Sequence, residues 1–132
     1  MKNLLLDTHI WLWAMLEPKR LVPRVAEELE SAGNELWLSP ISVWELIVLQ
    51  QKGRMLPEEK IETWIERALR ARPLKEAAVT FEVAREVGRI ELAHRDPADR
   101  FLVATARVFE LTLVTADETL IQSGVVQVLA NH

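Results

Sequence analysis

The sequence contains no cysteine, which excludes a disulfide framework and a thiolate metal site. It also lacks a long apolar run, because no window approaches 18 uninterrupted apolar residues, the minimum for a membrane-spanning helix. Residues 4–6 form too short an apolar stretch for the core of a signal peptide, and they lack a small-residue cleavage site. These absences lead us to expect a cytoplasmic protein that does not span a membrane.

An excess of positive charge is missing as well. The 16 Lys and Arg side chains are outnumbered by 20 Asp and Glu, and the net charge is −4, which argues against a surface uniformly attractive to nucleic acid. The balance is positive only between residues 50 and 107, where the basic residues include Arg67, Arg70, Arg72, Lys75, Arg85, Arg89, Arg95 and Arg100. This segment would suit a phosphate-binding face, but such charge runs more often form a solvated helix surface.

What remains is an ordinary globular composition in which strand and helix patterns alternate. At 132 residues with 49% apolar side chains, the chain is long enough for one domain, residues 1–132, and too short for two. We expect strands at residues 4–6, 36–38, 111–115 and 125–129. We expect helices at 8–16, 22–29, 42–53, 57–73, 80–90, 96–109 and 118–122. This alternation predicts an α/β fold with a mainly parallel central sheet.

Four carboxylates stand at the boundaries of these elements. Asp7 and Asp117 each follow an apolar strand, whereas Glu45 and Asp99 each fall in the first turn of a helix. Each has a simple structural explanation by itself, because acids favour first helical turns and Asp is a common N-cap. Glu45 would complete a capping box with Ser42, and Asp96 would cap the helix that contains Asp99.

Together, the four acids point to metal chemistry. Carboxylates gathered at one edge of a sheet repel one another unless a cation lies among them. Mg²⁺ and Mn²⁺ prefer such oxygen ligands and retain water and substrate phosphate oxygens. The pattern therefore predicts metal-assisted phosphodiester hydrolysis, with metal-activated water as the nucleophile.

The residues around these acids resemble the successive motifs of PIN domains, and above all those of VapC-type toxin ribonucleases from type II toxin–antitoxin systems. The motifs are residues 4–11, 39–46, 94–106 and 113–117, and they occur in the family's order over essentially the whole chain. The resemblance implies a three-layer α/β/α PIN-like fold and a Mg²⁺- or Mn²⁺-dependent endoribonuclease. It also implies a homodimer that is inhibited by a small VapB-type antitoxin.

Carried over by motif, the resemblance implies a catalytic and metal-binding site made of Asp7, Glu45, Asp99 and Asp117. Asp99 is chosen over Asp96 because the family's Asp-x-x-Leu-x-Ala-x-Ala pattern begins at residue 99. Further candidates for orienting the acids or contacting substrate are Thr8, Thr115 and Arg100, the last with an ion pair to Asp96 as its alternative. We expect surface or capping roles for His9 and His94. We expect packing roles for the tryptophans, with Trp64 as the one most exposed.

Three other functions are compatible with parts of this pattern. A PIN-like module that only docks a partner is disfavoured, because all four acids are present. A phosphoryl-accepting receiver domain would need a strand-end Lys near the acids, and neither late strand supplies one. A PIN-like nuclease that acts on DNA rather than RNA stays open from the sequence.

Overall fold

A computed structural model describes residues 1–53, 60–92 and 96–132. Within these residues five strands pair in parallel, in the order β3-β2-β1-β4-β5. They are β1 (Asn3–Leu6), β2 (Glu35–Leu38), β3 (Lys75–Glu76), β4 (Thr112–Thr115) and β5 (Val128–Ala130). The helices are α1 (Thr8–Leu16), η1 (Pro18–Arg20, a 3-10 turn), α2 (Pro23–Glu30), α3 (Pro40–Gln51), α4 (Ile61–Ala71), α5 (Phe81–Val87), α6 (Pro97–Phe109) and α7 (Glu118–Ser123).

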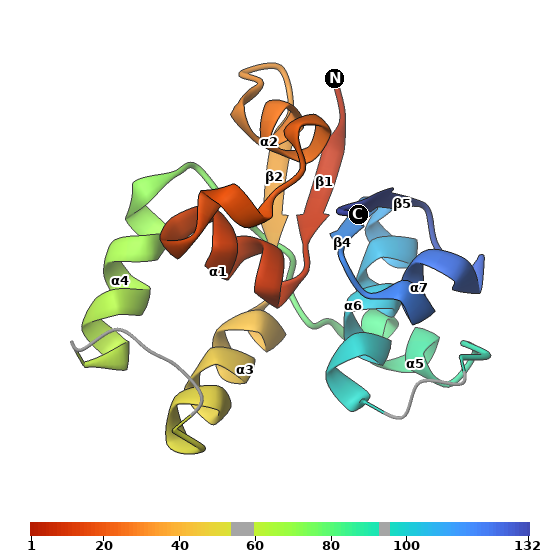
Figure 1. The fold of residues 1–132 in the computed structure, drawn as a ribbon. Helices are drawn as coiled ribbons and strands as arrows, with labels where there is room; N and C mark the ends of the chain where they lie inside the picture. The colour runs from red at the N-terminus through yellow and green to blue at the C-terminus, as the bar shows by residue number, and fades with distance from the viewer. Residues whose placement is uncertain (54–59, 93–95) are drawn as a thin grey trace.

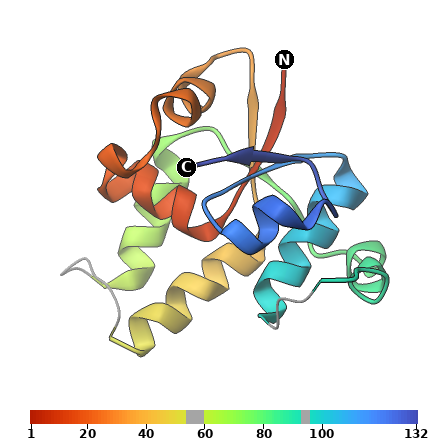
Figure 2. The ribbon, with the colours of Figure 1, turned by 45° about the vertical axis from the view of Figure 1, so that its right-hand side comes forward.

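Helices cover both faces of the sheet (Figures 1 and 2). Alternate side chains of a strand point to opposite faces, and β1 shows the division: Leu4 and Leu6 join the core beneath α1, α2 and α4, whereas Leu5 joins the core beneath α5 and α6. The predicted three-layer α/β/α architecture is therefore confirmed. Among the described helices, none combines the length and apolar character needed to cross a membrane.

Several predicted elements begin or end elsewhere. The helix expected from Ser42 starts at Pro40 and is capped by Ser39, whose hydroxyl accepts from the Ile41 amide at 3.0 Å. Strand β3 has two exposed residues and no apolar pattern, so periodicity could not reveal it. In the predicted strand 125–129, a bend at 125–126 delays pairing until Val128. The predicted helix start at Pro57 lies outside the described residues.

Trp64 corrects another expectation. We expected this side chain to be the most exposed tryptophan, but it is 2% exposed and lies 5.7 Å from the ring of Trp11. Both side chains belong to the core beneath α1 and α4. Trp44 on α3 is the exposed one, at 54%.

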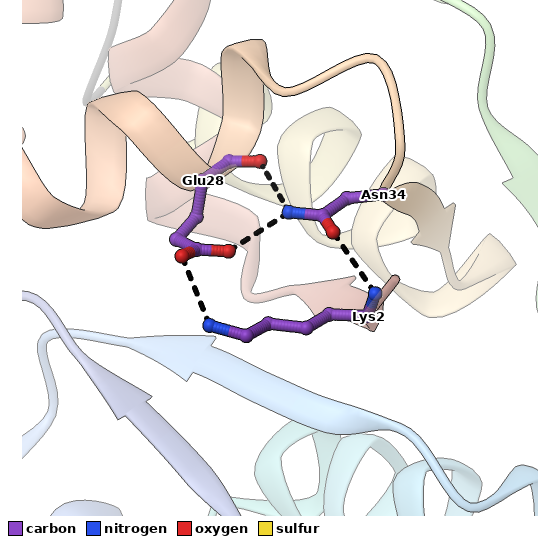
Figure 3. A network of polar contacts seen from close by, with 3 residues as sticks. All are labelled: Lys2, Glu28 and Asn34. Carbon is purple, nitrogen blue, oxygen red and sulfur yellow. Dashed lines mark hydrogen bonds and ion pairs between the residues drawn. The ribbon is translucent and has the colours of Figure 1, made fainter.

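A polar network fixes the amino-terminal end of β1 to α2 (Figure 3). The Asn34 amide group donates to the Glu28 carbonyl at 3.0 Å and to its carboxylate at 2.8 Å. The Asn34 side-chain oxygen accepts from the Lys2 amide at 2.9 Å, and the Lys2 ammonium donates to Glu28 at 2.9 Å. These bonds hold the start of β1 in place at the end opposite Asp7.

Candidate functional site

The neighbouring strands β1 and β4 mark the point where the strand order reverses. The chain builds β2 and β3 on one side of β1 and then crosses to form β4 and β5 on the other side. Ligands of open α/β sheets bind at such switch points, just beyond the carboxyl ends of the strands. Asp7 directly follows β1, and Asp117 stands two residues after β4.

A cleft of about 340 Å³ opens at this point, and all four predicted acids line it. They come from different elements: Asp7 precedes α1, Glu45 lies in α3, Asp99 lies in α6 and Asp117 precedes α7. The rest of the lining is Asp96, His9, Trp13 and Ala116. The fold therefore gathers acids that are up to 110 residues apart in the sequence.

Thr115 links the two acids at the strand ends. Its hydroxyl donates to Asp7 Oδ2 at 2.6 Å and accepts from the Asp117 amide at 3.0 Å. The side chain is fully buried at the last position of β4. Asp7 also accepts from the Thr8 amide at 2.7 Å, which makes it the N-cap of α1. Asp7 therefore has both oxygens held, one of them by Thr115; that this contact orients the acid for its function stays a prediction.

Thr8 has the same kind of position beside Glu45. Its hydroxyl lies 2.5 Å from Glu45 Oε1 and 2.9 Å from the Ser42 hydroxyl. The capping box predicted for Ser42 and Glu45 is therefore wrong, because α3 begins two residues earlier and both side chains turn toward Thr8 instead.

Burial and mutual repulsion act on the ionisation of two of the acids. Burial is the main reason why the pKa of Asp7 is raised, opposed by hydrogen bonds from Thr115 and Thr8 and by the charge of His9, and assisted by the negative charge of Asp117. Burial also raises the pKa of Glu45, opposed by the Thr8 hydrogen bond and assisted by Asp7 and Asp96. Without a bound cation, the ionised forms of these two carboxylates are therefore energetically unfavourable. This is expected for a site that binds a cation.

Asp96 and Asp117 also serve as N-caps. Asp96 Oδ1 accepts from the Ala98 amide at 3.0 Å, and Asp117 Oδ1 accepts from the Leu120 amide at 3.2 Å. Asp99, in the first turn of α6, is only 7% exposed. The predicted capping role of Asp96 is confirmed, and Asp99 stands beside it in the cleft lining.

Arg100 has partners outside the cleft. Its guanidinium donates to the carbonyls of Ile90 and Leu92 at 3.1 and 2.7 Å, and it thereby ties the segment after α5 to α6. The basic segment as a whole is rich in ion pairs, with Arg70, Arg72, Lys75 and Arg89 bonded to nearby glutamates. These contacts favour a solvated, ion-paired surface over a phosphate-binding face. His94 and Arg95 lie outside the described residues.

The lining has the donor chemistry of a hard divalent cation, because its acids offer only oxygen ligands. In the described part of the chain, no three acidic or histidine side chains stand close enough together to form a complete ligand set. Mg²⁺ does not require one, since it usually keeps several waters and binds through one or two carboxylates. The acids present therefore fit such an ion.

Four residues of the lining were not predicted as site residues: Asp96, which we expected only as a cap, Ala116, and the two aromatic residues of α1. His9 and Trp13 lie four positions apart on α1, and their rings are 5.8 Å apart. The sequence carries the relevant signal, because positions i and i+4 share a helix face. Which face of α1 looks into the cleft depends on tertiary packing.

Comparisons with known proteins agree with this geometry. The family model described as PIN domain matches residues 4–124. Ribonuclease VapC22 of Mycobacterium tuberculosis is 31% identical over 121 residues, which is 91% of each chain.

Solved structures show the same fold. The structure of VapBC2 from Rickettsia felis bound to a promoter DNA fragment has a TM-score of 0.70 at 16% identity, over 97% of this chain and 98% of that one. DNA-bound VapBC from Salmonella typhimurium has a TM-score of 0.70 at 19% identity and full coverage of both chains. Given the sequence motifs, the parallel sheet, the family model and the VapC22 relative, the chain belongs to the PIN domain family and is similar, within it, to VapC proteins.

Proposed function

We propose that this protein is a Mg²⁺- or Mn²⁺-dependent endoribonuclease and the toxin of a VapBC-type pair. The observation that carries the proposal is the cleft at the β1–β4 switch point, which Asp7, Glu45, Asp99 and Asp117 all line. The similarity to ribonuclease VapC22 supports RNA as the substrate. DNA is the second candidate, because a metal ion held by acids would act on the phosphodiesters of either nucleic acid.

In this proposal one or two of the four acids would hold the divalent ion directly through carboxylate oxygens, and the others would reach it through its bound waters. When bound, the ion supplies a water activated for attack on phosphorus and neutralises charge on the phosphate. Thr115 keeps Asp7 aimed into the cleft, and Thr8 does the same for Glu45. Burial of Asp7 keeps bulk water from competing for its oxygens.

The structural neighbours are VapBC complexes, and they support a VapB-type antitoxin as the partner. We also propose that the protein is a homodimer in the cytoplasm. Coexpression with any small open reading frame found next to its gene, followed by size-exclusion chromatography with light scattering, tests both the homodimer and the antitoxin partner. A protein that stays monomeric and does not bind the product of the neighbouring gene would contradict both claims.

The chemistry is tested by incubating the protein with matched single-stranded RNA and DNA. We expect RNA cleavage with Mg²⁺ or Mn²⁺, none with EDTA, and products with 5′-phosphate and 3′-hydroxyl ends. Products with 2′,3′-cyclic phosphates would indicate attack by the ribose hydroxyl and would refute the mechanism.

Asp99→Asn and Asp96→Asn form a matched pair for the site itself. Both substitutions remove one charge from the same helix turn, and Asn preserves the N-cap that Asp96 provides. We expect Asp99→Asn to lose at least about a hundredfold in activity, while Asp96→Asn retains most of it. If Asp96→Asn loses activity and Asp99→Asn retains it, the functional acid is Asp96 rather than Asp99.

A further inference from the structure

One wall of the cleft differs in chemistry from the rest. Apart from Ala116, the described lining consists of acids and of two aromatic rings, His9 and Trp13. Both rings are on α1, one helical turn apart, with a centroid separation of 5.8 Å and an angle of 51° between their planes. The aromatic wall, defined as His9 and Trp13, therefore begins two residues after Asp7.

The exposure of this wall is not explained by packing alone. On the same helix Ile10, Trp11 and Leu12 are buried, and they satisfy the core contacts of α1. His9 is exposed and Trp13 is half-buried, so both present ring surface to the cleft while Trp13 also contacts the core. An aromatic surface left partly open at a cleft suits a ligand that itself carries an aromatic ring.

A cation lies against this wall. The Arg20 guanidinium, at the end of η1, lies 4.2 Å from the centroid of the Trp13 ring. Its ion pair with Glu17 spans 3.2 Å between two side chains that are each more than half exposed. Such exposed pairs contribute little stability, so the guanidinium can exchange this partner for a phosphate, which it binds more specifically through two parallel hydrogen bonds.

We propose that His9, Trp13 and Arg20 form a nucleotide-binding subsite next to the acids, which stacks one base of single-stranded RNA and contacts its phosphate. The inference rests on the proposed ribonuclease function and adds the place where the substrate is held. Aromatic side chains bind single strands by stacking on bases of any sequence, and a nearby cation follows the backbone. His9 and Trp13 supply the stacking surface along one side of an otherwise acidic cleft, and Arg20, in contact with the Trp13 ring, supplies the cation.

The test compares Trp13→Leu, which removes the ring, with Trp13→Phe, which keeps one. Binding of a fluorescein-labelled 12-nucleotide single-stranded RNA is followed by anisotropy with Ca²⁺ in place of Mg²⁺, and kcat and KM are measured with Mg²⁺. We expect Trp13→Leu to raise Kd and KM about tenfold, as for loss of one stacked base, with kcat changed less than about threefold. Trp13→Phe should stay within about threefold of wild type.

Arg20→Gln provides an independent measurement, because loss of one phosphate contact should lower the slope of log Kd against log salt by about 0.7. This readout also covers the case in which Trp13→Leu fails to fold. The matched control is Phe81→Leu, which removes an aromatic ring that is 92% exposed on α5 and absent from the cleft lining. Phe81→Leu should bind RNA as wild type does.

Two outcomes would overturn the subsite. One is a folded Trp13→Leu protein with the Kd and KM of wild type, and the other is a Trp13→Phe protein as impaired as Trp13→Leu. Failure of the wild-type protein to bind or cleave any RNA would instead refute the proposed function.

Discussion

The Thr8 hydroxyl lies 2.5 Å from Glu45 Oε1 and joins two segments that are 37 residues apart in the sequence. A threonine hydroxyl has one proton, and a charged acceptor makes the stronger bond. Thr8 therefore donates to the ionised Glu45 and accepts from Ser42 at 2.9 Å. The orientation of Glu45 depends on this chain from Ser42 through Thr8.

Replacing Thr8 by Val removes the hydroxyl and keeps the shape. We expect RNA cleavage to fall about 10- to 100-fold, the usual loss when a group that orients a metal ligand is removed, and Thr8→Ser should restore most of it. The control is Thr105→Val, since Thr105 is also fully buried but donates to the Phe101 carbonyl within α6. If Thr8→Val and Thr105→Val cleave RNA equally well, the Thr8 contact has no role in catalysis.

Glu45→Gln separates charge from hydrogen bonding. The Gln amide oxygen still accepts from Thr8, but it cannot supply the negative charge that a hard cation needs. Activity should fall at least about a hundredfold. Thermal melts of the metal-free protein should show equal or higher stability, because burial and the charge of Asp7 disfavour the Glu45 carboxylate. If Glu45→Gln cleaves RNA as wild type does, Glu45 is not part of the functional site.

The sequence predicts the elements that periodicity and caps define. The Asp96 cap of α6 occurs as predicted, because side-chain caps are local interactions. The family motifs predicted four acids as site residues, and all four line the cleft. Strand β3 escaped prediction because its pairing with β2 is non-local and its two residues are exposed.

The errors at the site have the same physical origin. Ser42 and Glu45 have the spacing of a capping box, and only the tertiary approach of α1 to α3 redirects them to Thr8. Likewise, the sequence does not reveal that Arg100 would find two carbonyl acceptors after α5. Contacts between distant segments decided each case.

Asn34 offers a substitution that should affect stability alone. Its side chain makes three hydrogen bonds at the amino-terminal end of β1, away from Asp7. We expect Asn34→Ala to lower the free energy of unfolding by about 1–3 kcal/mol, since it leaves partly buried groups without partners. Below the melting transition kcat and KM should match wild type. A changed kcat in the folded variant would mean that this network acts on the site.

The last prediction concerns pH. Folding raises the pKa of Asp7 and Glu45, mainly through burial, so the folded state binds their protons more tightly than the unfolded state does. Their ionised forms therefore cost stability at neutral pH, and this cost disappears as pH falls through the folded pKa values toward the unfolded ones. Metal-free Glu45→Gln should melt above wild type at pH 7, and the difference should shrink on acidification.

Glu28 provides the control of opposite sign. Hydrogen bonds from Lys2 and Asn34 lower its pKa, so its ionised form stabilises the fold above the unfolded pKa, and this contribution is lost as pH falls through the folded pKa. Glu28→Gln should therefore melt below wild type at pH 7, and this difference should also shrink in acid. Melting curves from pH 4 to 8 in EDTA measure both. If Glu45→Gln melts below wild type at pH 7, its carboxylate stabilises the metal-free fold and the cleft is not preorganised to bind a cation.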